Sequence, residues 1–334
     1  MKASTARLRG YLAAGALLVL AGGANAAGPA GADSSDSYPE KPIRMVVPFA
    51  AGGGSDIVGR ILAQQLGIEL GRTVVVDNRP GAGSTIGADI VAKAPADGYT
   101  VLLGNISMAF NASLYKNLPY DAIRDLAPVS EVADQPNIVV IHPALPAKTV
   151  AEFAALARAK PGELTFASAG TGSGTHFAGE LLRMKLGIDM IHIPYKGTGP
   201  ALTDLIGGQV SMFVSTFASA LPHVQAGRLR ALGVTSARRS PAAPEVPTLL
   251  EAGVPDYAYS TWYGLLTPAG VARPIVAKLN AAVHKALAAE ALRRNFAAQG
   301  IDAVANTPPE FAAYIAAEIA KWREVVHAVH MPQQ

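Results

Sequence analysis

From Tyr38 onward, short β-type runs alternate with amphipathic helical stretches along the chain. The β-type runs are residues 43–49, 73–76, 99–103, 137–141, 164–167, 190–195, 210–215 and 229–235. The helical stretches include residues 56–70, 150–159, 175–186, 274–287 and 309–329. Strands that alternate with helices form parallel sheets covered by helices, so the sequence predicts an α/β fold with two parallel-type sheets.

Two proline-rich breaks predict a division of the chain into two lobes. Residues 136–148 are punctuated by prolines and mostly extended, and residues 241–255 carry prolines at 241, 244, 247 and 255. We expect the chain to cross into a second lobe near Asn137 and to return near Tyr259. The first lobe would then comprise residues 38–136 and 258–334, and the second residues 137–257. Both crossings would act as a hinge, with a ligand cleft between the lobes.

The N-terminus has the pattern of a secretory signal peptide, residues 1–26. Lys2, Arg7 and Arg9 precede an apolar stretch at 11–20, and the small-residue motif Ala-Asn-Ala ends at Ala26. This pattern predicts export to the periplasm with cleavage near Ala26. The alternative, an anchoring helix, is disfavoured because the apolar core is shorter than the roughly 20 residues needed to span a bilayer. Residues 27–37 are small and polar, which predicts a disordered lead-in.

Cleavage would leave 334 − 26 = 308 residues, enough for two lobes. The removed segment holds three basic and no acidic residues, so the mature chain has 28 − 3 = 25 basic residues against 25 acidic ones. This balance does not point to nucleic acid or an anionic membrane as a partner. The chain has no cysteine, which excludes a lipid anchor on that residue and leaves an exported form to be stabilised by packing.

Glycine-rich loops follow several of the predicted strands. The first, residues 50–56, has three consecutive glycines before a predicted helix, and residues 168–176 repeat the arrangement in the second lobe with added hydroxyls. Residues 78–84 and 195–200 are two further loops of this kind. A helix N-terminus has free N–H groups and the positive end of the helix dipole, so such loops bind anions without a cationic side chain. The four loops therefore predict an anion, most simply a carboxylate, in the cleft.

Several side chains near these loops have two interpretations each. Asp56 is either a helix N-cap, which we favour, or a ligand contact suited to an amine or hydroxyl. His176 is either a structural group at a helix start, which we favour, or a ligand contact. Arg79 is either a loop-bracing residue or a cation for the ligand. The aromatic residues between 257 and 263 are interpreted as packing around a crossing strand rather than as a ligand wall.

Other catalytic and cofactor motifs do not fit. Gly81, Gly83 and Gly87 miss the dinucleotide fingerprint by one position, and no glycine loop is followed by the Lys-Ser/Thr pair of phosphate-binding NTPases. No serine lies in a G-x-S-x-G hydrolase elbow. The histidines are scattered without close partners in the sequence, so we expect neither a metal site nor a cofactor.

The ordered motifs resemble the Bug (TctC-like) substrate-binding proteins of tripartite tricarboxylate transporters along essentially the whole mature chain. The resemblance is carried by YPEKPIRMVVPFAAGGGSD, VVDNRPGAGSTIGADIVAKAPADGYTVLLG, IPYKGTGPALTDLIGGQV, LRALGVTSARRSPAAPEVPTLLEAG and WYGLLTPAGVARPIVAKLN. It implies a two-lobed periplasmic binding protein of the type II fold that captures small organic acids and passes them to a membrane permease.

The resemblance also implies ligand-binding residues at the matching positions. In the first loop these are Ala50, Ala51, Gly52, Gly53, Gly54 and Asp56, and in the second-lobe loop they are Ser168, Gly170, Thr171, Gly172, Ser173 and Gly174. Positions that should line the cleft elsewhere are Asn105, Ser107, Tyr195, Thr198, Ser215 and Thr216.

The function expected from these observations is a monomeric periplasmic receptor for a small carboxylate, with an aliphatic or aromatic dicarboxylate favoured. Its partner would be the permease of a tripartite tricarboxylate transporter, and it would catalyse no reaction. One alternative is a carboxylate sensor that signals to a membrane kinase. Another is a hydrolase of carboxylic esters or amides that uses Ser173 and His176.

Overall fold

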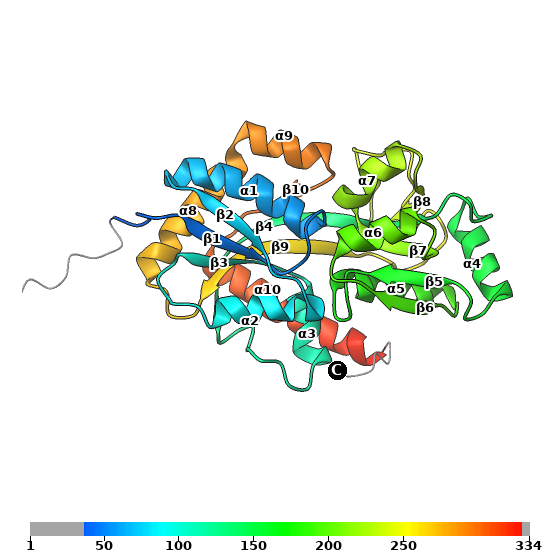
Figure 1. Cartoon of the computed structure of the whole chain (residues 1–334), viewed down its shortest axis with the longest axis horizontal. Coiled ribbons are helices and arrows are strands. Elements are labelled where there is room, and N and C mark those ends of the chain that lie inside the picture. The colour runs from blue at the N-terminus through cyan, green and yellow to red at the C-terminus, as the bar shows by residue number, and fades with distance from the viewer. Residues whose placement is uncertain (1–36, 329–334) are drawn as a thin grey trace, which may run out of the picture.

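The computed structural model describes residues 37–328, which form one elongated α/β molecule (Figure 1). The predicted signal peptide lies outside the described residues, as does all but Ser37 of the predicted lead-in. The strands are β1 (Ile43–Val47), β2 (Val74–Asn78), β3 (Thr100–Asn105), β4 (Leu126–Ile141), β5 (Thr165–Ser168), β6 (Ile191–Pro194), β7 (Met212–Thr216), β8 (Arg230–Val234), β9 (Ser260–Pro268) and β10 (Asp302–Ala303).

Helices follow most of these strands. They are α1 (Gly54–Leu70), the short 3-10 turn η1 (Ala82–Ser84), α2 (Thr85–Ala92), α3 (Ser107–Leu114), α4 (Val150–Ala159), α5 (Gly174–Leu186), α6 (Thr198–Ile206), α7 (Phe217–Gln225), α8 (Arg273–Ala288), α9 (Glu290–Ala298) and α10 (Pro308–Ala328). Within the described residues, no helix combines the length and the apolar character needed to cross a membrane.

The strands are hydrogen-bonded in the order β2-β1-β3-β9-β4-β7-β5-β6, with β8 and β10 also paired to β4. The long strand β4 joins the two lobes. Its residues as far as Pro136 pair with β9, whereas from Asn137 onward they pair with β7 and β8. Figure 1 shows the two lobes side by side with β4 and β9 passing between them.

The prediction of parallel sheets holds for β1, β2 and β3 in one lobe and for β5, β6 and β7 in the other. The central strands differ, because β9 is antiparallel to both β3 and β4, and β4 is antiparallel to β7 and β8. These two strands connect the lobes and are not part of a strand–helix–strand crossover unit. The rule that such units have parallel strands therefore does not apply to them.

The C-terminal helix α10 packs on β4 and α3 and is anchored by aromatic side chains. Phe311 is fully buried, and its ring occupies the space where a side chain at Gly264 would lie. The Trp322 ring lies 5.0 Å from Phe110 on α3 and 5.2 Å from Phe177 on α5. Helix α10 therefore contacts elements of both lobes close to the point where they meet.

Candidate functional site

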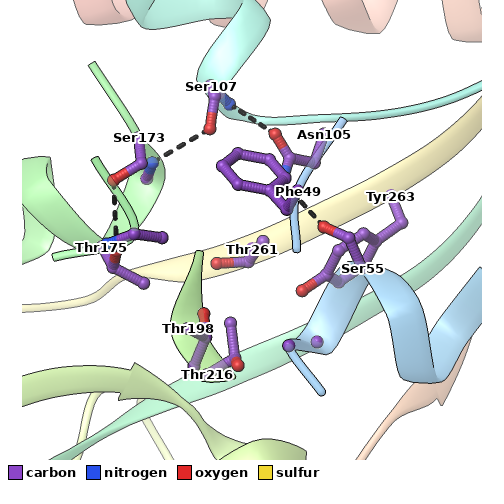
Figure 2. A pocket seen from close by; sticks show the side chains of 14 residues that line it. Phe49, Ser55, Asn105, Ser107, Ser173, Thr175, Thr198, Thr216, Thr261 and Tyr263 are labelled. Carbon is purple, nitrogen blue, oxygen red and sulfur yellow. Dashed lines mark hydrogen bonds between the residues drawn. The ribbon is translucent and has the colours of Figure 1, made fainter. Parts of the chain in front are cut away.

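A small cavity lies between the lobes (Figure 2). It is lined by Phe49, Gly53, Gly54, Ser55, Asn105, Ser107, Ala169, Ser173, Gly174, Thr175, Thr198, Thr216, Thr261 and Tyr263. No charged side chain is among these described residues. The polar groups of the lining are eight hydroxyls, one side-chain amide and the backbone.

Five helices from the two lobes begin at this cavity. The first turn of α1 contributes Gly54 and Ser55, and the start of α5 contributes Gly174 and Thr175. Helices α3, α6 and α7 each contribute their first residue or N-cap, which are Ser107, Thr198 and Thr216. A helix N-terminus is equivalent to about half a positive charge, so the five together make the cavity attractive to an anion.

The first glycine loop presents bare backbone to the cavity. Gly52 has φ 80°, a left-handed conformation that favours glycine, and Gly53 caps α1 without any side-chain hydrogen bond. The N–H groups of Gly54 and Ser55 have no hydrogen-bond partner among residues 37–328. A Cβ atom at Gly54 would lie 2.5 Å from the side chains of Gln135 and Tyr263. The loop therefore needs glycine both for its turn and for close packing under the cavity.

The second glycine loop is held by hydroxyls at the start of α5. Ser173 Oγ accepts from the N–H of His176 at 3.2 Å, and Thr175 Oγ1 accepts from the N–H of Ala169 at 2.8 Å. The N–H of Gly174 donates to Ser107 Oγ across the cleft at 3.0 Å (Figure 2). This last bond ties the N-terminus of α5 in one lobe to the N-terminus of α3 in the other.

A chain of side chains continues from Ser107 along the first lobe. The N–H of Ser107 donates to Asn105 Oδ1 at 3.0 Å, and Asn105 Nδ2 donates to Ser55 Oγ at 3.3 Å. Next to Ser55, Gln135 Nε2 donates to the hydroxyl of Tyr263 (Figure 2). Burial raises the pKa of Tyr263 well above its usual value, so this hydroxyl stays protonated and able to donate.

Asp56 lies in the first turn of α1 but does not line the cavity. Its carboxylate accepts from the N–H of Gly52 at 3.0 Å, from Asn78 Nδ2 at 3.0 Å and from Arg60 at 2.9 and 3.0 Å. Burial by itself would raise the pKa of Asp56, but the hydrogen bonds from Arg60, Gly52 and Asn78 outweigh it and hold the pKa below its usual value. The N-cap is Gly53, so Asp56 braces the loop rather than capping the helix.

His176 is buried behind the second glycine loop, in agreement with the structural interpretation. Its Nδ1 accepts from the N–H of Gly172 at 3.3 Å, and its ring stacks on His192 with centroids 3.9 Å apart. Burial lowers the pKa of His176 to about 3, with a smaller contribution from His192, so the ring is neutral at pH 7. Nδ1 is bonded to the loop, Nε2 lies 3.8 Å from Glu180, and Ser173 Oγ contacts the backbone N–H of His176 rather than its ring, so the ring is not placed as a base for Ser173.

Arg79 is placed away from the cavity. Its guanidinium pairs with Asp77 at 3.0 Å and is half exposed. The aromatic residues 257–263 mostly pack, as expected: Tyr257 and Tyr259 donate to the carbonyls of Ala178 and Gly174. Tyr263 is the member of this group that lines the cavity.

The structure brings eight of the sequence-predicted residues together in the lining. These are Gly53, Gly54, Asn105, Ser107, Ser173, Gly174, Thr198 and Thr216. The other ten do not line the cavity: Ala50, Ala51, Gly52, Asp56, Ser168, Gly170, Thr171, Gly172, Tyr195 and Ser215. Several of these instead hold the loops in place; Tyr195, for example, donates its hydroxyl to Asp204 at 2.7 Å.

Six lining residues were not in the predicted set. They are Phe49, Ser55, Ala169, Thr175, Thr261 and Tyr263. Four of them adjoin or lie within the glycine loops, and their position next to a predicted helix start was a usable signal. Thr261 and Tyr263 come from β9, far away in the sequence, and only the strand pairing brings them to the cavity.

The glycine loops also contact one another across the cleft. The N–H of Ala50 donates to the carbonyl of Lys196 at 3.3 Å, and a Cβ atom at Gly199 would lie 2.5 Å from the carbonyl oxygen of Ala51. On the other rim, a Cβ atom at Gly83 would lie 2.3 Å from the carbonyl oxygen of Thr171. Backbone thus meets backbone at two places around the cavity.

Within the described residues, no group of three or more His, Cys, Asp or Glu side chains is arranged to hold a metal ion.

The model of the tripartite tricarboxylate transporter family receptor, TctC, matches residues 58–331. The chain belongs to this receptor family. Family members are periplasmic solute-binding receptors rather than enzymes, and they bind small carboxylates and work with transporter permeases.

Individual relatives of this TctC-family receptor cover nearly its whole length. Protein BugT of Bordetella pertussis is 42% identical over 302 residues, which are 90% of this chain and 93% of BugT. The solved structure of R. palustris Rpa4515 with adipate is 33% identical, has a TM-score of 0.86 and covers 88% of this chain and 99% of its own. MatC of Rhodopseudomonas palustris, with bound malate, is 34% identical with a TM-score of 0.82, covering 86% of this chain and 100% of its own.

Proposed function

We propose that this TctC-family receptor captures a small dicarboxylate in the cavity between its lobes and delivers it to the permease of a tripartite tricarboxylate transporter. It would act in the periplasm as a monomer, after removal of residues 1–26. The observation that carries the proposal is the convergence of five helix N-termini, from both lobes, on a cavity lined without charged side chains.

In this proposal the residues of the two lobes approach opposite ends of the acid. The first lobe, residues 38–136 and 258–334, supplies the N–H groups of Gly54 and Ser55. The second lobe, residues 137–257, supplies Thr175, Thr198 and Thr216. The hinge would lie where β4 crosses at Asn137 and where the chain returns near Tyr259.

The two similar proteins solved with adipate and malate support a dicarboxylate. Hydrogen bonds alone can hold a dicarboxylate without a cationic side chain, because each hydrogen bond to a charged group contributes about 1.5 to 3 kcal/mol net. Three or four such bonds per carboxylate, less the cost of ordering the ligand, reach the roughly −8 kcal/mol of a micromolar complex.

Isothermal titration calorimetry on the mature chain tests the proposal directly. The panel is malate, succinate, glutarate, adipate, citrate and phthalate, and we expect at least one dicarboxylate to bind with a micromolar Kd. The variant Ser107→Ala removes a hydroxyl from the lining and should weaken that binding about tenfold or more. Ser236→Ala removes an exposed hydroxyl outside the cavity and serves as the control. A flat titration with every acid in the panel would reject the proposal.

A further inference from the structure

We propose that two histidines outside the cavity, His176 and His192, are positioning residues for the ligand, because their rings hold the second glycine loop by hydrogen bonds. Neither histidine lines the cavity, so both act through the loop rather than by touching the acid. The inference rests on the proposed function, since it names the residues that keep one side of the proposed ligand site in its binding form.

The second glycine loop needs support because of its backbone conformation. Gly170 and Gly172 have φ angles of 122° and 80°, which residues with a side chain rarely adopt. Glycine also loses more conformational freedom than any other residue when it is ordered, so such a loop is costly to hold in one form. The residues that follow, Ser173, Gly174 and Thr175, line the cavity. Contacts that fix the loop at Gly170 and Gly172 therefore also place these three lining residues.

His176 holds the loop at Gly172. Its Nδ1 accepts from the N–H of Gly172 at 3.3 Å, and its backbone N–H donates to Ser173 Oγ at 3.2 Å. A ring nitrogen that accepts a hydrogen bond carries no proton, so the neutral ring has its proton on Nε2, which lies 3.8 Å from Glu180 Oε1. A protonated ring would instead face the N–H of Gly172 with an N–H of its own. The contact with the loop therefore requires one tautomer of the neutral ring.

His192 holds the start of the loop through a serine. Its Nε2 lies 2.6 Å from Ser168 Oγ, and the same oxygen accepts from the N–H of Gly170 at 3.1 Å. A serine hydroxyl has one proton and two acceptor lone pairs, so it can bond to both partners with either tautomer of the His192 ring. His192 lies on β6, which pairs with β5. The ring thus ties the start of the loop to the neighbouring strand.

The two rings also support each other. The His176 and His192 rings stack with centroids 3.9 Å apart and planes inclined by 19°, and Phe166 stacks on His192 at 4.9 Å. Packed aromatic rings hold each other in a fixed orientation, so each ring nitrogen is kept pointing at its partner. The stack therefore couples the bond to Gly172 with the bond to Ser168.

The charge state of the pair agrees with this role. Burial lowers the pKa of His176 to about 3 and that of His192 to about 4, so both rings are neutral at pH 7. The charged groups that face the pair are Glu180 and Arg183 on α5, which pair with each other at 2.8 Å, and Asp189, which lies 3.7 Å from Arg183. These charges offset one another and leave the rings as neutral hydrogen-bonding groups.

Asparagine and glutamine allow a reciprocal test, because each reproduces one half of an imidazole. The side-chain amide of asparagine lies where Nδ1 of a histidine lies, whereas that of glutamine reaches the place of Nε2. His176 bonds to the loop through Nδ1 and His192 through Nε2. Calorimetry at pH 7.5 with the acid that binds wild type most tightly should therefore find His176→Asn and His192→Gln within about threefold of wild type. His176→Gln and His192→Asn should bind about fivefold more weakly or worse.

A role limited to filling space predicts a different pattern. Glutamine is larger than asparagine, so it would be the better replacement at both positions. Glutamine as the better replacement at both positions, or equal affinity in all four variants, would overturn the inference and leave the proposed function standing. If no acid bound the wild-type chain, the proposed function would fall and this inference with it. Urea unfolding of the same samples measures whether each variant is folded.

NMR spectroscopy of the wild-type protein gives a second test that depends on no variant. Long-range ¹H–¹⁵N spectra of the chain labelled with ¹⁵N-histidine distinguish a protonated ring nitrogen from an unprotonated one. We expect His176 to carry its proton on Nε2 and none on Nδ1 at pH 7.5, unchanged at pH 5.5. The backbone amide of Gly172 should exchange slowly with solvent. The opposite tautomer of His176, or a ring that becomes charged between these two pH values, would overturn the inference.

Discussion

At the start of α1, the Asp56 carboxylate connects Gly52, Asn78 and Arg60 through hydrogen bonds of 2.9 to 3.0 Å. One of these partners is a backbone N–H of the glycine loop itself. A loop with three glycines loses much conformational entropy when it orders, and these bonds offset part of that loss before any ligand arrives. At the residue scale, Asp56 therefore keeps the N–H groups of Gly54 and Ser55 facing the cavity.

The variant Asp56→Asn should lower the free energy of unfolding at pH 7 by about 2 kcal/mol, because it removes the charge from a buried group with several donors. Since folding lowers the pKa of Asp56, its contribution exists above the usual pKa and is lost as pH falls through the folded value. Urea unfolding of wild type and D56N should thus converge at acid pH.

The control for this prediction is Glu290→Gln, at a carboxylate that also pairs with an arginine one helical turn away. Glu290 and Arg294 are 83% and 73% exposed and 3.5 Å apart, so this change should alter stability by less than about 0.5 kcal/mol. Equal losses of unfolding free energy in D56N and E290Q would show that the hydrogen bonds of Asp56 do not stabilise the fold more than an exposed ion pair does.

At the scale of elements, Gly199 of α6 and Gly83 of η1 also allow the two lobes to approach each other closely across the cleft. Gly199 lies in the first turn of α6 against the carbonyl of Ala51, and Gly83 in η1 lies against the carbonyl of Thr171. Any Cβ atom at these positions would hold the two lobes apart. The glycines thus permit the close approach that encloses the cavity, in addition to exposing backbone to the ligand.

Gly199→Ala should therefore weaken binding of the acid by ten- to a hundredfold while changing the ligand-free stability by less than about 1 kcal/mol, since an open form relieves the clash. Titration calorimetry and urea unfolding of the same samples measure the two effects. The control is Gly207→Ala at the other end of α6, where the added Cβ would meet only ordinary contacts and φ is −77°. Unchanged affinity in G199A would disprove this role.

The packing of α10 on β4 predicts a pH dependence of stability. Burial, with smaller contributions from Asp134 and Glu318, raises the pKa of Glu131 on β4 to about 7. The folded chain then binds more protons at this site than the unfolded chain between about pH 4.5 and 7, so the free energy of unfolding should fall as pH rises through this window. The loss should be on the order of 2 kcal/mol between pH 5 and 8.

Glu131→Gln should remove most of this decline, because its amide does not ionise. Urea unfolding at pH 5, 6.5 and 8 measures it, with the exposed Glu245→Gln as a control for loss of a carboxyl group. Parallel pH profiles for wild type and E131Q would contradict the assignment of the decline to Glu131.

The sequence predicted the outer elements better than the central ones. Helix α4 has the predicted bounds of 150–159, and α1, α5, α8 and α10 differ from prediction by one or two residues at either end. The first part of β4 was not predicted, because Asp134, Gln135 and Pro136 interrupt the apolar pattern there, and β9 was expected only as a crossing strand around residues 257–263. Their strand character comes from pairing with each other across more than 100 residues of sequence, which no local pattern reveals.

The site was predictable to a similar extent. A glycine loop at a helix start is a local feature, so eight of the fourteen lining residues could be named beforehand. Which face of each loop turns to the cavity depends on contacts between loops of different lobes, such as Ala50 with Lys196. Those contacts have no counterpart in the sequence of either loop alone.

At the scale of the whole molecule, the described lobes meet through apolar as well as polar contacts. Phe110 on α3 stacks on Phe177 on α5 with centroids 4.2 Å apart, and Trp322 lies edge-on to both. Near the cavity, the bond between Gly174 and Ser107 joins the same two helices. A ligand that forms hydrogen bonds with both lobes binds this closed arrangement more tightly than an open one. Its binding therefore shifts the equilibrium toward the closed arrangement.

The most direct test of the account is a crystal structure of the mature chain with the acid that binds most tightly in calorimetry. We expect a carboxylate of the ligand to lie between the lobes within hydrogen-bond distance of the N–H groups of Gly54, Ser55 or Thr175, with lining hydroxyls completing its contacts. A ligand whose carboxylates are held mainly by arginine or lysine side chains, or that lies outside this cavity, would contradict it.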